Sequence, residues 1–273
     1  MRMLSATVAT DAGSLIDAPR RYVVTGAASG IGAATRALLE HAGNRVIGVD
    51  LRDAEVVADL STQDGRAAML EAVGQRADGG LEGVIACAGV PGQSGDPERI
   101  VKVNYFGALA SLEGLRPLLA RGTRPRAAAV ASIALLRAPI DALVDACLAG
   151  DEPRALARRG GDGHAAYTST KLALARWARR AAPSEDWAGA GIALNIVAPG
   201  IIDTPMAAYL VGTPELRART VAETPQPFGQ VGAADDVASL LAWLTSGYNG
   251  FVTGQVIFAD GGFEAVSRGS QWP

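Results

Sequence analysis

The stretch Thr25-Gly26-Ala27-Ala28-Ser29-Gly30-Ile31-Gly32 decides the fold of this chain. It lies between a short β-rich run and an amphipathic helical pattern, so it predicts a tight strand-to-helix turn. Gly26 permits the turn, Gly30 lets the backbone approach a ligand, and Gly32 allows close packing of helix and strand. Free amides at the helix start would then face a pyrophosphate. A purely structural glycine turn is the alternative, and this spacing disfavours it.

Outward from this turn, β-rich runs alternate with helical patterns, which is typical of βαβ units around a parallel sheet. We therefore expect an α/β protein: one doubly wound Rossmann domain at 21–273, with a seven-stranded parallel sheet and helices on both faces. The strands are predicted at 22–25, 45–50, 55–58, 83–87, 127–132, 192–197 and 255–259. The main helices are predicted at 31–41, 63–73, 97–119, 164–181 and 234–244. Residues 1–20 lack periodicity and are interpreted as a flexible leader.

An acidic residue, Asp50, ends the second predicted strand, where the crossover places the adenosine ribose of a dinucleotide. Its carboxylate would accept hydrogen bonds from the ribose hydroxyls, whereas a 2′-phosphate would meet like charge. The glycine turn contains no cation to offset that repulsion, and Arg52 is interpreted as a solvated loop charge. The sequence therefore predicts NAD(H) rather than NADP(H).

Tyr167 and Lys171 stand four residues apart on the predicted helix at 164–181, and Lys171 is one of only two lysines in the chain. This spacing places both side chains on one helix face, so the ammonium is expected to lie beneath the phenol and favour the phenolate. A tyrosine tuned in this way would exchange protons near neutral pH. An incidental surface pair is the alternative.

Composition excludes several classes of function. The 273 residues carry a net charge of −3 and 5% aromatic residues, which disfavours binding to nucleic acid or to anionic membranes. No apolar run has the length of a membrane span or a signal peptide. Cys87 and Cys147 form no metal-binding pattern with histidine, so no metal is expected, and a reduced cytoplasmic protein is predicted.

Together these motifs resemble the short-chain dehydrogenases/reductases over residues 21 to about 266. The resemblance implies a catalytic tetrad of Asn104, Ser132, Tyr167 and Lys171. In it, Tyr167 exchanges the substrate proton, Lys171 lowers the pKa of that tyrosine and holds the nicotinamide ribose, and Ser132 binds the substrate oxygen. Asn104 would anchor a water molecule that links Lys171 to solvent. A strand-end hydroxyl for Ser132 and a helix-distorting role for Asn104 are the structural alternatives.

The resemblance also implies the contacts with the cofactor. Asp59 and Leu60 match the adenine-binding position, and Cys87 replaces an asparagine of the family's Asn-Asn-Ala-Gly strand. After Pro199-Gly200, Ile202 would back the nicotinamide and Thr204 would bond its carboxamide. The residues expected to contact NAD are Gly26, Ser29, Gly30, Ile31, Gly32, Asp50, Leu51, Asp59, Leu60, Cys87, Ala88, Gly89, Tyr167, Lys171, Pro199, Gly200, Ile202 and Thr204.

Within the family, the stretches 48–56 and 103–107 and the segment before Tyr167 look most like the bacterial NAD-dependent 3α-hydroxysteroid dehydrogenases/carbonyl reductases. This implies an enzyme that interconverts a secondary alcohol and a carbonyl on a small hydrophobic substrate. A coniferyl-alcohol-type dehydrogenase and an NADPH-dependent 3-oxoacyl reductase are the enzymatic alternatives. A dinucleotide-binding, redox-sensing regulator is the alternative without catalysis.

Two further segments are expected to shape the site and the assembly. A helical insert is predicted at about 135–163, with short helices at 140–149 and 152–159. As the resemblance implies a homodimer or homotetramer, the insert would block one contact surface and favour the dimer; alternatively, Leu135, Leu136 and Ile140 border the substrate mouth. Residues 205–228 are predicted to form a mobile lid, and an ordinarily packed helical segment is the alternative. Its apolar underside would comprise Met206, Tyr209, Leu210 and Phe228.

Overall fold

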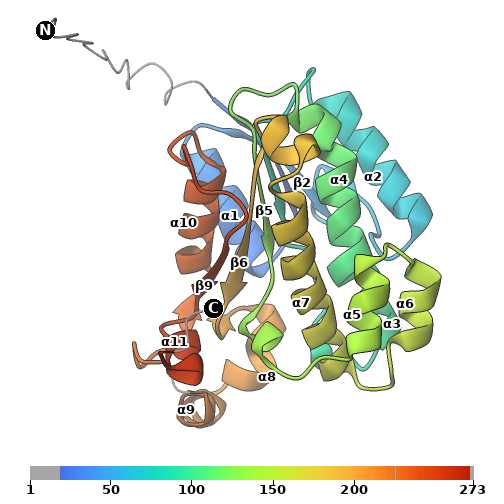
Figure 1. The fold of residues 1–273 in the computed structure, drawn as a ribbon. Coiled ribbons are helices and arrows are strands. Elements are labelled where there is room, and N and C mark those ends of the chain that lie inside the picture. Colours follow the sequence, from blue (N-terminus) through green and yellow to red (C-terminus); the bar gives the residue numbers. More distant parts are fainter. Residues whose placement is uncertain (1–18, 225, 271–273) are drawn as a thin grey trace, which may run out of the picture.

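The computed structural model describes residues 19–224 and 226–270, so the predicted leader lies outside the described residues except for its last two positions. A seven-stranded parallel sheet with the order β3-β2-β1-β4-β5-β6-β9 forms its centre (Figure 1). This confirms the predicted doubly wound α/β fold. The strands are β1 Arg21–Thr25, β2 Arg45–Asp50, β3 Val56–Val57, β4 Gly83–Ala86, β5 Arg126–Val130, β6 Ala193–Pro199 and β9 Val256–Ala259.

The central strands are apolar on both faces because helices cover both faces of the sheet. Successive side chains point to opposite sides, so Val23 and Val84 join one core cluster while Val24 and Ile85 join the other. The first cluster lies under α2 Gln63–Arg76, α4 Ala108–Leu119 and α7 Gly163–Ala181 (Figure 1). The second lies under α1 Gly30–His41 and α10 Ala234–Thr245.

The predicted long helix at 97–119 is not one continuous α-helix. It consists of α3 Pro97–Val101, a π-helical turn η2 Lys102–Gly107, and then α4. Asn104 lies inside the π-helical turn and is completely buried. A wider turn of this kind redirects the side chains that follow it and is frequent at functional sites. Hydrophobic periodicity alone does not reveal one inserted residue in a helix.

The region predicted as a helical insert contains two short helices, α5 Asp141–Leu148 and α6 Glu152–Arg158. α5 packs against α7 and α6, and α6 also contacts α3 (Figure 1). A largely buried ion pair ties α6 to α2, with Arg66 and Glu152 2.7 Å apart.

The remaining elements surround the carboxyl ends of the strands, apart from η4, which precedes β6. They include a two-stranded sheet that the sequence did not predict, formed by β7 Ile202–Asp203 and β8 Gly232–Ala233. Across the described residues, no helix combines the length and the apolar character needed to cross a bilayer. The rest of the elements are η1 Gly92–Ser94, η3 Ile133–Leu136, η4 Glu185–Gly189, η5 Pro205–Ala207, α8 Ala208–Val211, α9 Pro214–Glu223 and α11 Phe263–Arg268.

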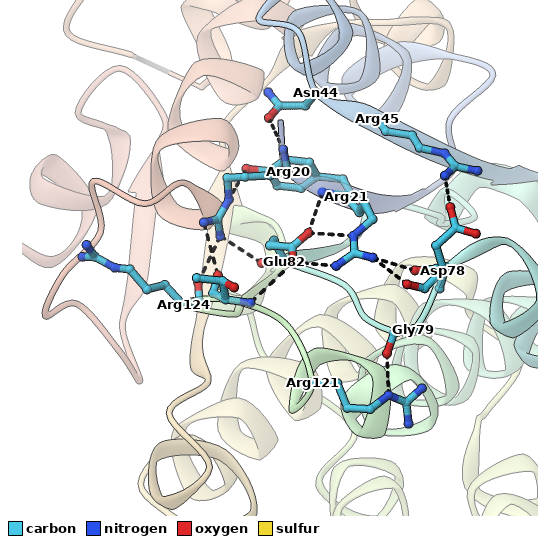
Figure 2. Close-up of polar contacts among 12 residues, drawn as sticks. Arg20, Arg21, Asn44, Arg45, Asp78, Gly79, Glu82, Arg121 and Arg124 are labelled. Atoms are coloured by element: carbon cyan, nitrogen blue, oxygen red, sulfur yellow. Dashed lines mark hydrogen bonds and ion pairs between the residues drawn. The ribbon is translucent and has the colours of Figure 1, made fainter. Parts of the chain in front are cut away.

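A polar network connects residues at the amino-terminal ends of the strands, and Figure 2 shows its contacts. The Glu82 carboxylate accepts hydrogen bonds from the Arg21 backbone at 2.8 Å and from the Arg21 guanidinium at 3.0 and 3.1 Å. Arg20 donates to the carbonyls of Thr123, Arg124, Thr245 and Glu82. Burial opposes ionisation of Glu82, but the hydrogen bonds and charge of Arg21 outweigh it and lower the pKa of Glu82.

Candidate active site

A cavity of about 510 Å³ opens at the carboxyl ends of the central strands, where ligands bind in open α/β sheets. Every residue that the sequence predicts to contact the cofactor lines this cavity, although the residues come from loops far apart in the chain. Ser132 lines it as well, whereas Asn104 lies behind its wall. The structure therefore gathers the predicted site residues around one space.

The glycine turn leaves no room for larger residues. Gly26 has a φ of +69°, and a Cβ on it would lie 2.9 Å from the backbone of Ala88. A Cβ on Gly32 would lie 2.1 Å from the carbonyl oxygen of Gly26. Gly30 adopts a φ of +53°, which L-residues with side chains rarely adopt. These positions hold the turn against the neighbouring strand end, and the helix α1 starts directly above the cavity.

Asp50 is held at the rim of the cavity by backbone amides. Its carboxylate accepts hydrogen bonds from Ala28 N at 2.9 Å and from Leu51 N at 2.7 Å. Arg52 extends into solvent with its side chain 86% exposed, which agrees with its interpretation as a solvated loop charge. A fixed carboxylate beside the glycine turn is suited to accept hydrogen bonds from a ribose.

Asp59 and Leu60 also line the cavity, together with Arg99 from α3. Burial opposes ionisation of Asp59, but hydrogen bonds from Ser61 and the charge of Arg99 outweigh it and lower the pKa of Asp59. Sequence reasoning missed Arg99, because nothing in the spacing of α3 distinguishes it from a solvated helix charge. The cradle of glycines, the free amides and the fixed Asp50 carboxylate fit a dinucleotide.

Ser132, Tyr167 and Lys171 meet on the other side of the cavity. Ser132 lies two residues beyond the end of β5 and caps η3, where its hydroxyl accepts a hydrogen bond from Ala134 N at 3.2 Å. Lys171 is 4% exposed, and its Nζ donates to the carbonyl oxygen of Val130 at 2.7 Å. The same Nζ lies 5.7 Å from the centre of the Tyr167 ring, so the predicted common face is observed.

The expected electrostatic effect of Lys171 on Tyr167 is wrong for this structure. Burial raises the pKa of Tyr167, hydrogen bonding with Ser132 opposes the rise, and neighbouring Tyr209 adds to it. Burial also lowers the pKa of Lys171 to about 8, while Cys87 has a small opposite effect. The spacing of the pair predicts their proximity, but it contains no information about how much water reaches them.

Asn104 braces the loop that follows β4. Its Oδ1 accepts from Val90 N at 2.7 Å, and its Nδ2 donates to Val90 O at 2.9 Å. A Cβ on Gly89 would lie 3.4 Å from Asn104 Oδ1 and 3.7 Å from Lys171 Nζ, so the two side chains share that wall. The helix-distorting role weighed from the sequence agrees with the π-helical turn around Asn104.

The mouth of the cavity differs in part from the sequence prediction. Met206, Tyr209 and Leu210 line it as expected, but Phe228 does not, because its side chain is 82% exposed. Leu135 and Ile140 pack on the core instead, and Leu136 does not line the cavity either. The η3 region contributes Ile133, Ala134 and Arg137, and α7 contributes His164.

Known proteins with similar sequences include dehydrogenases and reductases. A family model described as "Enoyl-(Acyl carrier protein) reductase" matches residues 155–264. The chain is 37% identical to the 3-alpha-hydroxysteroid dehydrogenase/carbonyl reductase of Comamonas testosteroni, over 92% of this chain and 98% of that protein. It is 30% identical to a cis-4-hydroxycyclohexanecarboxylate dehydrogenase of Sinomonas cyclohexanicum, over 91% and 98%.

One similar solved structure is the 3-alpha-hydroxysteroid dehydrogenase from Pseudomonas sp. B-0831 complexed with NADH. Its TM-score is 0.86 with 40% sequence identity, and the match covers 92% of this chain and all of that one.

Proposed function

This chain belongs to the short-chain dehydrogenase/reductase family, and we propose that it uses NAD(H) to interconvert a secondary alcohol and a carbonyl on a hydroxysteroid-type substrate. The single observation that carries the proposal is the shared cavity. One half offers the glycine turn and the Asp50 carboxylate, and the other half offers Ser132, Tyr167 and Lys171. A dinucleotide and a small alcohol can therefore lie side by side within it.

Different residues in the cofactor half of the cavity would contact different parts of the dinucleotide. The glycine turn and the amides at the start of α1 would hold the pyrophosphate, Asp50 the adenosine ribose, and Asp59 with Leu60 the adenine. Ile202 and Thr204 would contact the nicotinamide end. When bound, NAD⁺ supplies the acceptor for the hydride that leaves the alcohol carbon.

Residues of the chain would carry out the proton transfer and hold the substrate. As the phenolate, Tyr167 would take the alcohol proton during oxidation, and as the phenol it would donate a proton to the substrate oxygen during carbonyl reduction. Ser132 would donate a hydrogen bond to the substrate oxygen and stabilise the negative charge that develops there. Lys171 would hold the nicotinamide ribose, and Asn104 would anchor a water molecule beside it.

The substrate class is supported by the apolar mouth and by the relatives. Met206 and Leu210 offer apolar surface above the reacting groups. Both relatives compared over their full length are named for secondary alcohols on rings, a hydroxysteroid and a hydroxycyclohexanecarboxylate. A coniferyl-alcohol-type dehydrogenase would share the apolar mouth, so it stays the alternative to be separated by substrate.

Particular residues disfavour an NADPH-dependent 3-oxoacyl reductase and a redox-sensing regulator. The reductase requires room for a 2′-phosphate, and the fixed Asp50 carboxylate would repel one. A regulator without catalysis has no need for Ser132, Tyr167 and Lys171 around one cavity. Cofactor titration with NADH and NADPH tests for the reductase, and turnover tests for the regulator.

We further propose that the protein acts in the cytoplasm as a homodimer. Cys87 and Cys147 are free thiols, as expected for a reducing compartment. α5 and α6 cover part of the outer surface of α7 and α3, where they would obstruct one face otherwise open to a second copy.

A Tyr167→Phe variant tests the proposed function. It removes the proton-exchanging oxygen, so turnover of hydroxysteroids with NAD⁺ should fall by a factor of about 10² to 10⁴. Binding of NADH, followed by fluorescence titration, should change little. The wild-type panel includes hydroxysteroids, aromatic alcohols and simple secondary alcohols, and Tyr248→Phe is the control because Tyr248 lies outside the cavity. Near-normal turnover by Tyr167→Phe would refute the assignment.

A further inference from the structure

An arginine at the mouth of the cavity has no role in the scheme above. Arg137 follows η3, the short helix that Ser132 caps, and it lines the cavity. Within the described part of the chain, its guanidinium makes no hydrogen bond and has no carboxylate within 4.0 Å, although twelve ion pairs form elsewhere. The cation is therefore available to a ligand.

The backbone around Arg137 is fixed on both sides. Arg137 N donates to Ala134 O at 3.0 Å, and Ile140 N donates to the hydroxyl of Ser169 on α7 at 2.8 Å. Only the four residues of η3 separate Arg137 from Ser132. The guanidinium thus starts from a defined place on the stretch of cavity wall that also contains Ser132.

Tyr209 lines the same cavity and neighbours both Tyr167 and Arg137. It is close enough to Tyr167 to raise the pKa of Tyr167, and close enough to Arg137 that the cation lowers the pKa of Tyr209, against a larger rise caused by burial. A substrate that presents its alcohol to Tyr167 would therefore lie in the cavity that Arg137 also lines. Glu223 is the carboxylate that lines the cavity near the lid, and it lies 3.9 Å from Arg219 of its own helix.

We propose that Arg137 selects substrates that carry a carboxylate at the end remote from the reacting carbon, by pairing with that carboxylate at the cavity mouth. This rests on the proposed function, because it assumes that the alcohol lies at Ser132 and Tyr167. A guanidinium binds a carboxylate through two parallel hydrogen bonds, which gives direction as well as attraction. A neutral ester or amide of the same skeleton forms a weaker contact.

The test compares a hydroxy acid with its methyl ester on one ring skeleton. Wild-type enzyme should favour the acid in kcat/KM, and Arg137→Gln should raise KM for the acid about tenfold while leaving kcat and the ester unchanged. The control is Arg176→Gln, because Arg176 is an exposed arginine of α7 outside the cavity. An equal effect of Arg137→Gln on acid and ester, or no effect on either, would overturn the proposal.

A second readout separates this inference from the proposed function. Calorimetric titration of the NADH complex with the acid and the ester measures their affinity ratio without turnover. A ratio that favours the acid in wild type and falls about tenfold in Arg137→Gln supports the role of Arg137 even if the alcohols are not oxidised. A ratio near one in wild type overturns that role even if neutral hydroxysteroids are oxidised readily.

Discussion

Lys171 carries an electrostatic cost because its ammonium is buried. Its ammonium is almost completely buried and has one described hydrogen-bond acceptor, the carbonyl oxygen of Val130. Burial disfavours the charged form, which is why the pKa of Lys171 falls from 10.5 to about 8. The residue is therefore expected to serve chemistry at the expense of stability.

Lys171→Met should stabilise the protein without cofactor at about pH 7. The folded-state pKa lies below the unfolded one, so the penalty is fully present below pH 8 and is relieved as the pH rises from 8 to 10.5. The gain should be about 1 to 3 kcal/mol, less the loss of the Val130 contact. Urea unfolding at about pH 7 and about pH 9.5 measures it.

Lys102→Met is the matched control, since Lys102 is partly exposed and paired with Glu98 at 2.6 Å. It should change stability by less than about 1 kcal/mol. An equal effect of Lys171→Met at both pH values would contradict the burial argument.

At the scale of the elements, the Arg21–Glu82 pair lies at the amino-terminal ends of the strands, opposite the site. Glu82 opens the connection into β4, and Arg21 begins β1, so their contact joins two central strands (Figure 2). The backbone N–H and the guanidinium of Arg21 both donate to the Glu82 carboxylate, whose side chain is 9% exposed. A pair of this kind costs more to break than a fully exposed ion pair, because the partly exposed Arg21 guanidinium, at 29% exposure, loses its charged partner.

Glu82→Gln should lower the free energy of unfolding by about 1 to 3 kcal/mol at neutral pH. The depressed pKa of Glu82 means that its contribution is present above the ordinary value of 4.5 and is lost as the pH falls through the folded-state pKa. The difference between wild type and Glu82→Gln should therefore shrink on acidification, which denaturant titrations at several pH values would measure. For comparison, Glu98→Gln on the exposed surface should change stability much less than Glu82→Gln does. A pH-independent difference for Glu82→Gln would refute the prediction.

The elements that carry local signals could be predicted from the sequence. The glycine turn gave the position of β1 and α1, and the short helices α5 and α6 agree with their predicted ranges to within two residues. The sequence did not reveal the π-helical turn at 102–107 or the pairing of β7 with β8. Both depend on contacts between distant segments, and two-residue strands have no periodicity to detect.

On the scale of the whole molecule, α5 and α6 cover part of the outer surface of α7 and α3, and we propose that this limits how copies of the chain can associate. α5 packs against α7, and the Arg66–Glu152 ion pair joins α6 to α2. We expect light scattering to give a mass of about twice 27.9 kDa, because one potential contact face is covered. The mass should not depend on protein concentration over the micromolar range. A stable tetramer would contradict this prediction.

The site shows where sequence reasoning stops. The glycines, Asp50 and the Tyr167–Lys171 pair could be proposed from the residues themselves, because each combines a residue type with a position at a strand end or on a helix face. Ser132 and Asn104 were proposed through the family resemblance. Arg99 and Arg137 could not be proposed, because their place in the cavity depends on how the loops fold together. Phe228 was misassigned to the lid interior because its loop is fastened by a backbone contact with Gly261, which leaves the ring in solvent.

The hydrogen bond from Gln93 Nε2 to Met206 O, 3.0 Å long, joins the two rims of the cavity mouth. It is one contact between the loop after β4 and η5. A single neutral hydrogen bond has a net strength of about 1 kcal/mol, so this contact alone favours the joined arrangement only about fivefold. By itself it would therefore not hold the two rims together.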